Sequence, residues 1–425
     1  MDRSQVYIII DALLYLITFV YWLNKIRTMN TGIVILLIMT ISHFAAFFYY
    51  TTLRDLGFMN YEIQLIPCIY LYLMILLSIY PFLTQKDIVK IDDFGNRKVI
   101  KYLSILAIIL NVEPLVENIF LLFTSQNDYS ELYDGMREGT LDLYSGIGSL
   151  LMGWSSHFKI FTSVAFFYYL AGKTKNRVLI IGLFACMINY ILYWINCGGR
   201  GGVVSQLLIY FLTFILFKQL LPKDKLKKLA KIAVMITVPL VVVFVLISSS
   251  RHEKISEKST KMESVGLVGG IIFYVSEGPV RFNTEMWDGK HNTKGDVNFN
   301  YLKDKLGLKT YITYEDRDVV YLSKNGRRVE VFYTYVGDFV SDLGIIGGFI
   351  ACLVLSIVSK RLICRYRCMP FQNLLILVFI LHIYSIGFAA NIYRAYGLQR
   401  SIMYTFLLFF VMSILNNKPH KFIAK

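Results

Sequence analysis

The chain has 425 residues, of which 56% are hydrophobic and 17% are charged, with a formal net charge of +15. Several apolar runs exceed the 18 residues that cross about 30 Å of hydrocarbon, which excludes an ordinary soluble enzyme. A β-barrel would alternate apolar and polar residues in short segments, and that pattern is absent. The composition therefore predicts an all-α polytopic membrane protein.

Hydropathy divides the chain into eleven candidate transmembrane helices. The first eight occupy residues 1–249, a long loop follows at 250–334, and the last three lie in 335–425, which ends in a short tail. No cleavable signal peptide is expected, because Asp11 interrupts the first apolar run and no small-residue cleavage site follows it. The predicted spans are 5–24, 32–51, 63–84, 101–123, 157–172, 178–196, 203–219, 230–249, 335–358, 372–391 and 400–416.

The distribution of basic residues predicts how these helices are oriented. If the N-terminus lies outside, the inward segments hold 23 lysines and arginines and the short outward segments hold 7. The other 14 lie in the loop 250–334, which is too long for the positive-inside rule to apply. We therefore expect an N-out/C-in topology. The positive charge then lies beside anionic lipid, and no nucleic-acid partner is expected.

Two longer outward segments carry recognisable patterns. The stretch 124–156 is acidic and continues into LLMGWSSHF, which is typical of an interfacial helix with Trp154 at headgroup level. In the long loop, DVVYLSKNGRRVEVFY alternates apolar and polar residues around an Asn-Gly pair, which predicts a small β-hairpin. Its strands are expected near 318–323 and 328–333.

Acidic residues inside the spans are candidates for function, because charges are costly in hydrocarbon. Asp11 lies in the outer half of the first span, and Glu113 and Glu117 share one face of the fourth. One interpretation is a path for protons or cations. The other, which we favour, is structural pairing in a polar environment, because a proton-coupled transporter usually has more such groups.

The stretch YWINCGGRGGVVSQLL at 193–208 places Arg200 among four glycines, directly before a span. In the predicted topology, the N-terminus of this span points outward with its free amides and the positive end of its dipole. Glycines let a phosphate approach the backbone, and arginine adds a forked, permanently charged donor. The pattern predicts a phosphate or pyrophosphate site. The alternative is that the glycines end a helix and Arg200 reaches lipid headgroups.

Further outward residues could contribute to such a site. Arg281 lies in YVSEGPVRFNTEMWDG at 274–289, among carboxylates and aromatic rings that suit a sugar-binding surface. A folded loop with ordinary salt bridges explains this stretch equally well. Three other outward arginines are Arg251, Arg394 and Arg400. No soluble-enzyme motif and no set of metal ligands is recognised, so neither a cofactor nor a metal is expected.

Three stretches carry a resemblance to a known family. They are Arg200-Gly201 at the start of a span, SEGPVRFN at 276–283, and FYTYVGDFVSDLGIIGG at 332–348, where the loop re-enters the membrane. Their order resembles that of the Wzy-type O-antigen and capsule polymerases, which are related to the O-antigen ligases. The ligases carry a histidine at the position occupied here by Tyr333-Thr334, and its absence favours a polymerase.

The resemblance implies a glycosyltransferase in the bacterial cytoplasmic membrane, with its active site facing the periplasm or exterior. Its substrates would be undecaprenyl-pyrophosphate-linked oligosaccharides, and its partners membrane lipid, a chain-length regulator and a flippase. The alternatives are a ligase-like transferase, a flippase or other transporter, and a non-catalytic assembly partner.

The resemblance also implies roles for individual residues. Arg200 and Arg281 would bind the pyrophosphate, assisted by Arg394 or Arg400, and Glu277 or Asp338 would be the base for the acceptor hydroxyl. Further contacts to substrate are expected from Arg251, Tyr274, Trp287 and Tyr335.

Overall fold

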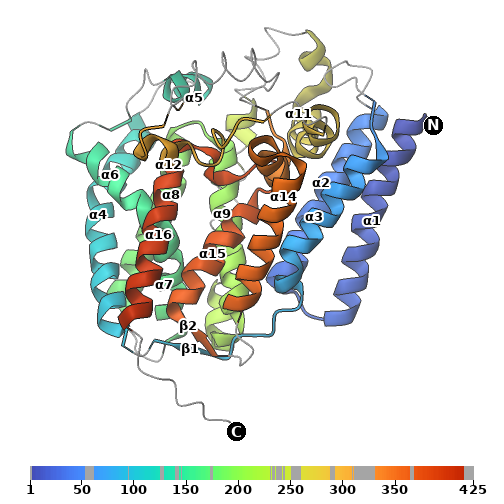
Figure 1. The fold of residues 1–425 in the computed structure, drawn as a ribbon. Helices are drawn as coiled ribbons and strands as arrows, with labels where there is room; N and C mark the ends of the chain where they lie inside the picture. Colours follow the sequence, from blue (N-terminus) through green and yellow to red (C-terminus); the bar gives the residue numbers. More distant parts are fainter. Residues whose placement is uncertain are drawn as a thin grey trace.

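A computed structural model shows the chain as a bundle of helices (Figure 1). It describes residues 2–52, 62–93, 95–124, 129–138, 143–144, 146–172, 176–229, 231, 235, 242, 245–249, 260–287, 292–308, 310, 331–363 and 368–415. Within these residues, eight helices are long and apolar enough to cross a membrane. They are α1 (Arg3–Ile26), α2 (Thr31–Thr52), α3 (Leu65–Leu83), α4 (Arg97–Thr124), α8 (Arg177–Asn196), α9 (Arg200–Phe217, continued by η2, Lys218–Leu220), α14 (Thr334–Leu362) and α16 (Tyr396–Leu415).

Ten of the predicted spans overlap helices of the structure. Two of these helices, α7 (Lys159–Ala171) and α15 (Phe371–Ser385), have only 13 and 15 residues. The predicted span 230–249 lies largely outside the described residues, and so does most of the predicted hairpin. A helical, membrane-type fold is thus confirmed, whereas the full number of spans and their orientation stay predictions.

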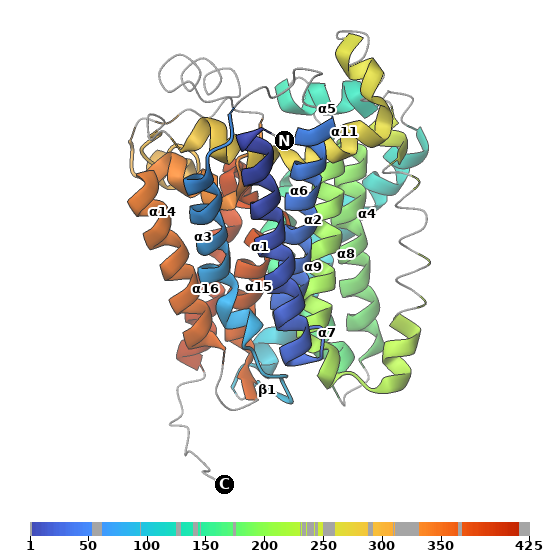
Figure 2. The ribbon, with the colours of Figure 1, turned by 90° about the vertical axis from the view of Figure 1, so that its right-hand side faces the viewer.

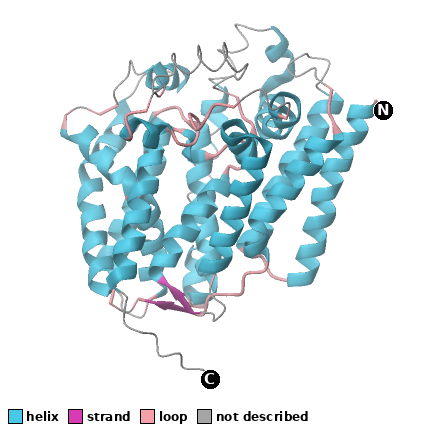
Figure 3. Ribbon diagram, viewed as in Figure 1, coloured by secondary structure: helices cyan, strands magenta, loops and turns pink. Residues whose placement is uncertain are grey.

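The two ends of the bundle differ. At one end lie α5 (Tyr129–Glu138), α11 (Thr260–Arg281) and α12 (Asn300–Lys305), and we call it the α11 end (upper in Figure 1). At the other, β1 (Lys90–Asp92) pairs in parallel with β2 (Cys368–Pro370), the magenta arrows of Figure 3, and we call it the β1–β2 end. The stretch expected to form an interfacial helix is helical, as α6 (Ile147–His157) near the α11 end with Trp154 46% exposed, and its position at a membrane interface stays a prediction.

The helix α11 lies within the segment that sequence analysis treated as a loop. Figure 2 shows much of it lying across the end of the bundle instead of along it. One face packs on α2: the Ser42 hydroxyl donates to the Val275 carbonyl at 2.8 Å, and the rings of Tyr49 and Phe273 lie 5.6 Å apart. Val280 joins the same apolar cluster. Packing against α2 therefore holds α11 in place.

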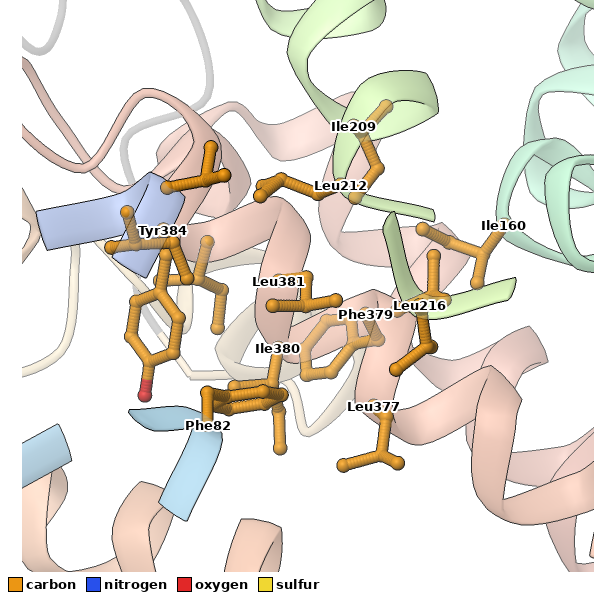
Figure 4. Close-up of a cluster of buried hydrophobic side chains, with 14 of the residues drawn as sticks. Phe82, Ile160, Ile209, Leu212, Leu216, Leu377, Phe379, Ile380, Leu381 and Tyr384 are labelled. Atoms are coloured by element: carbon orange, nitrogen blue, oxygen red, sulfur yellow. The ribbon is translucent and has the colours of Figure 1, made fainter. Parts of the chain in front are cut away.

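The core is organised around α15. Every residue of this helix except Asn373 is buried. Figure 4 shows Phe379 of α15 close to Leu216 of α9, and Ile380 of α15 beside Phe82 of α3. A helix enclosed by other helices needs apolar side chains on all faces, which explains its uniformly apolar sequence.

Two of the predicted intramembrane acids have identifiable surroundings. Asp11 Oδ2 and His43 Nδ1 are hydrogen bonded at 2.5 Å, and both side chains are buried. The carboxylate of Glu117 lies against Gly148, in the first turn of α6. The pairing of Asp11 with His43 fits the structural interpretation, whereas Glu117 Oε2 is buried without a hydrogen-bond partner among the described residues, so the role of Glu117 stays a prediction.

Buried amides join α4 to α8. Asn118 donates to Asn189 at 2.7 Å, and Asn189 donates to Asn111 at 2.8 Å. Asn196 donates to the side-chain oxygen of Asn118 at 2.8 Å. In an apolar environment such interhelical hydrogen bonds stabilise helix association, typically by about 0.6–2 kcal/mol each.

We expect Asn189→Leu to lower the free energy of unfolding by about 1–3 kcal/mol, because it leaves buried amide groups on α4 without partners. The measurement is reversible unfolding of the purified protein in mixed micelles. Val116→Leu on the exposed face of α4 is the control and should change little. Equal stability of Asn189→Leu and the wild type would contradict a stabilising amide network.

Candidate functional site

The glycines around Arg200 are packed against protein side chains and backbone. Gly198 has φ +61°, a conformation that favours glycine, and a Cβ there would overlap the Tyr129 carbonyl oxygen. A Cβ at Gly202 would overlap the indole of Trp194. A Cβ at Gly199 would likewise overlap Trp194, and a Cβ at Gly201 would overlap the Tyr274 hydroxyl. The glycines thus let α9 begin in close contact with α8 and α11, so their local packing differs from the open phosphate cradle that the sequence suggested.

Arg200 begins a chain of contacts between cations and aromatic rings. Its guanidinium carbon lies 5.0 Å from the centroid of the Tyr274 ring, and Tyr274 meets Phe332 edge to face at 4.8 Å. On the other side, the guanidinium carbon of Arg394 lies 5.4 Å from the Phe332 centroid. Two arginines that are 194 positions apart are therefore held on either side of one aromatic pair.

Arg281 forms the buried part of the same site. Its Nε donates to Glu277 Oε1 at 2.8 Å and its Nη1 to Glu285 Oε1, and the Tyr333 hydroxyl donates to Glu285 Oε2 at 2.8 Å. Arg281 is 4% exposed and Glu277 is 6% exposed. Burial of these charges is tolerated because each is paired and hydrogen bonded.

Helical spacing on α11 presents these groups together. Tyr274, Glu277 and Arg281 follow one another at intervals of three and four residues, so they share one face of the helix. The neighbouring face carries Phe273 and Val280, which pack near α2. Docking of the apolar face on α2 therefore turns the charged face toward Arg200 and Arg394.

Asp338 connects α14 to Arg394. It is fully buried, its Oδ2 accepts the backbone N–H of Asn391 at 2.8 Å, and its Oδ1 lies 4.0 Å from Arg394 Nη1. Arg394 also donates to the Val331 carbonyl at 3.1 Å. The short helix η4 (Ile392–Arg394) is thus anchored to the start of α14.

The second acid of the quoted VGDFVSDLG stretch has a structural task. Asp342 accepts the backbone N–H groups of Val297 and Asn298 at 3.0 and 2.7 Å, and also the Asn298 side chain at 2.7 Å. Two residues later, Gly344 has φ +71° and ψ 178°, and α14 is kinked there. Asp342 therefore fixes the segment before α12, and Gly344 permits the break in α14.

Burial sets the protonation of Glu277. Loss of solvation raises the pKa of this carboxyl from 4.5 to about 7, against the opposing effects of Arg281 and Arg394. The nearby negative charge of Glu285 acts in the same direction as burial. Glu277 can therefore exchange a proton near neutral pH, as a general base must.

The structure brings six of the predicted residues into one cluster, which we call the arginine site: Arg200, Tyr274, Glu277, Arg281, Asp338 and Arg394. Sequence reasoning did not assign roles to Glu285, Phe332 or Tyr333. The spacing of four residues from Arg281 could have indicated Glu285 as an ion-pair partner, whereas no local signal places Phe332 between two arginines.

Four predicted residues lie elsewhere. Arg400 is exposed and faces the ring of Tyr301 at 5.5 Å, away from the contacts just described. Trp287 packs on Tyr70, with ring centroids 5.2 Å apart. Tyr335 is fully buried in the core, and its hydroxyl is hydrogen bonded to Ser78. Arg251 lies outside the described residues.

The fold and this site define a helical protein of the membrane type with a cluster of arginines and carboxylates at one end of its bundle. Comparison of the chain with protein-family models, with curated proteins and with solved structures gives no match. The site must therefore be interpreted from its own chemistry.

We expect Gly202→Ala to lower the thermal unfolding temperature and to displace the start of α9, because the new methyl group meets the Trp194 ring. Thermal unfolding in detergent measures the loss. The double variant Gly202→Ala/Trp194→Leu should recover part of it, since the smaller side chain makes room. Failure of the double variant to recover any stability would argue against this contact.

The raised pKa of Glu277 predicts how the stability of the protein depends on pH. Its folded pKa of about 7 lies above the unfolded value, so the folded state binds more protons between about pH 4.5 and 7. The contribution of Glu277 to stability is therefore greatest at low pH and is lost as the pH rises through 7. The unfolding temperature of the wild type, relative to Glu277→Gln, should fall between pH 5.5 and 8. A flat difference would contradict the raised pKa.

Proposed function

We propose that the chain is a glycosyltransferase that polymerises undecaprenyl-pyrophosphate-linked oligosaccharide repeat units into O-antigen or capsular polysaccharide. The arginine site carries this proposal. Three separate segments, the start of α9, the end of α11 and η4, bring Arg200, Arg281 and Arg394 to one end of the bundle. Guanidinium groups arranged in advance are suited to a pyrophosphate leaving group, on which negative charge develops during glycosyl transfer.

The proposed orientation places the α11 end outside the cytoplasmic membrane. Support comes from the basic residues near the opposite end, where β1 and the start of α4 contribute Lys90, Arg97, Lys98 and Lys101. An excess of lysine and arginine is typical of cytoplasmic loops. The lipid-linked substrates would then meet the arginine site at the outer leaflet.

In the proposed reaction, a hydroxyl of one lipid-linked unit attacks the anomeric carbon of the growing glycan. The bond from that carbon to the pyrophosphate oxygen breaks, and the pyrophosphate leaves on its lipid. Glu277, with its pKa of about 7, is the stronger candidate to accept the hydroxyl proton. Asp338 is the second candidate; like Glu277 it is buried beside an arginine, with its Oδ1 4.0 Å from Arg394 Nη1.

The proposal is tested with purified protein and its native lipid-linked repeat unit in proteoliposomes. The wild type should give a ladder of longer glycans, and Arg200→Ala should reduce the rate of their formation by about 100-fold or more, as loss of one transition-state contact does. Arg200→Lys should recover only part of the rate, because lysine lacks the forked geometry.

Lys305→Ala is the matched control for this assay. Lys305 also lies at the α11 end, but its side chain is 55% exposed and contacts Asp304 and Tyr301. It should retain the wild-type rate. No ladder from the wild type, together with movement of lipid-linked units between leaflets, would favour a transporter over a polymerase.

A further inference from the structure

Three segments that carry residues of the arginine site meet at one buried place. In the turn after α15, the Ala389 carbonyl accepts the backbone N–H of Thr334 at 2.8 Å. Gly278 of α11 lies directly against the same turn, because a Cβ there would overlap the Phe388 carbonyl oxygen and would stand 3.2 Å from Thr334 Cγ2. We call Gly278, Thr334 and residues 387–390 the junction.

The junction is next to most of the arginine site along the chain. Glu277 directly precedes its glycine, Asp338 lies four residues after its threonine, and Arg394 lies four residues after its turn. Asp338 is also bonded to the end of that turn, since its Oδ2 accepts the backbone N–H of Asn391 at 2.8 Å. A displacement at the junction therefore moves these charged groups relative to one another.

Thr334 has a backbone conformation that its side chain disfavours. Its φ is +68°, in the left-handed region that favours glycine, and a β-branched residue there is a clear outlier. The residue is also fully buried. Strained residues persist only where the surrounding structure holds them, and they cluster at functional sites. A threonine here is favourable only if its side chain makes contacts that glycine could not.

The two branches of the Thr334 side chain make different contacts. The hydroxyl oxygen Oγ1 accepts the backbone N–H of Gly337 at 3.1 Å and so satisfies an amide in the first turn of α14. The methyl carbon Cγ2 lies beside Gly278 of α11. A serine would supply the hydroxyl equally well, so the methyl group is the part that this hydrogen bond does not need. Its contact sets how closely α14 approaches α11.

We propose that Thr334 is a positioning residue of the arginine site, whose methyl group holds the start of α14 at a fixed distance from α11. This contact keeps Glu277 and Arg281 of α11 in place relative to Arg394. Reacting groups displaced by about 1 Å can lose about 100-fold in rate. The inference rests on the proposed function for its effect on glycosyl transfer, whereas its effect on the geometry of the site does not.

The first test compares Thr334→Ser with Thr334→Val in the polymerisation assay. Thr334→Ser loses only the methyl group, so it should unfold near the wild-type temperature but show a kcat at least about tenfold lower, with little change in KM. Thr334→Val keeps a methyl group beside Gly278 but leaves the Gly337 N–H without its acceptor. It should therefore unfold at a lower temperature and yet retain a higher kcat than Thr334→Ser. Activities that follow stability would overturn the inference.

A second measurement needs no substrate. Burial raises the pKa of Glu277, and Arg281 and Arg394 lower it. Because Thr334→Ser lets α11 move away from Arg394, the pH dependence of stability that Glu277 causes should shift to higher pH. It is measured as the difference in unfolding temperature between proteins with Glu277 and with Glu277→Gln, in the wild-type and Thr334→Ser backgrounds. An unchanged midpoint would overturn the inference.

Thr213→Ser is the matched control, since it also removes one buried methyl group. Thr213 is fully buried in α9, 13 residues beyond Arg200 and thus about 20 Å from the start of that helix. Its kcat and its midpoint should equal those of the wild type. If Thr334→Val does not fold, Thr334→Ala replaces it. Thr334→Ala should match Thr334→Ser in kcat but unfold at a lower temperature, because the two differ only in the hydroxyl.

The two measurements separate this inference from the proposed function. A shifted midpoint in Thr334→Ser, with no glycan ladder from the wild type, would uphold the positioning role and reject the polymerase. A ladder from the wild type, with an equal kcat and an unchanged midpoint in Thr334→Ser, would do the reverse.

Discussion

The arrangement of the α11 end depends on the buried pairing of Arg281 with Glu277 and Glu285. These charges can lie inside the protein only while all three side chains are held together. Their spacing of four residues makes the pairing a property of α11 and the turn that follows it. Because the other face of the helix is docked on α2, the ion pairs also fix where the aromatic ring of Tyr274 can meet Arg200.

Hydropathy was sufficient to locate most helices, since an apolar run of span length has few alternatives. It missed α11, because its sequence mixes Ser276, Glu277 and Arg281 with apolar residues, and its stability comes from packing on α2. Hydropathy also could not show that α15 is enclosed by other helices, while α4 exposes Val116 and Phe123. Both sequences are apolar, and only the tertiary arrangement distinguishes a core helix from one at the surface of the bundle.

The candidate site was predictable in its members but not in its geometry. Position before a span identified Arg200, and local spacing linked Arg281 to Glu277. Nothing local relates Arg200 to Arg394, because their proximity depends on Tyr274 and Phe332 from two further segments. For the glycines, the sequence did predict a feature, but a different one from that observed. Their pattern favoured a phosphate cradle, whereas the space beside them holds Trp194 and Tyr274. A glycine signals close approach without saying what approaches.

Charge balance shapes what the arginine site can bind. Arg281 is paired with Glu277 and Glu285, and Asp338 lies near Arg394, so three carboxylates accompany three arginines before any substrate arrives. A pyrophosphate would have to compete with these carboxylates for the guanidinium groups. Glu277 relieves that competition if it becomes protonated, and its pKa of about 7 makes the step inexpensive at neutral pH. In the proposed reaction, Glu277 would have to be ionised before attack; when it accepts the proton of the acceptor hydroxyl, its ion pair with Arg281 weakens and Arg281 can turn to the leaving pyrophosphate.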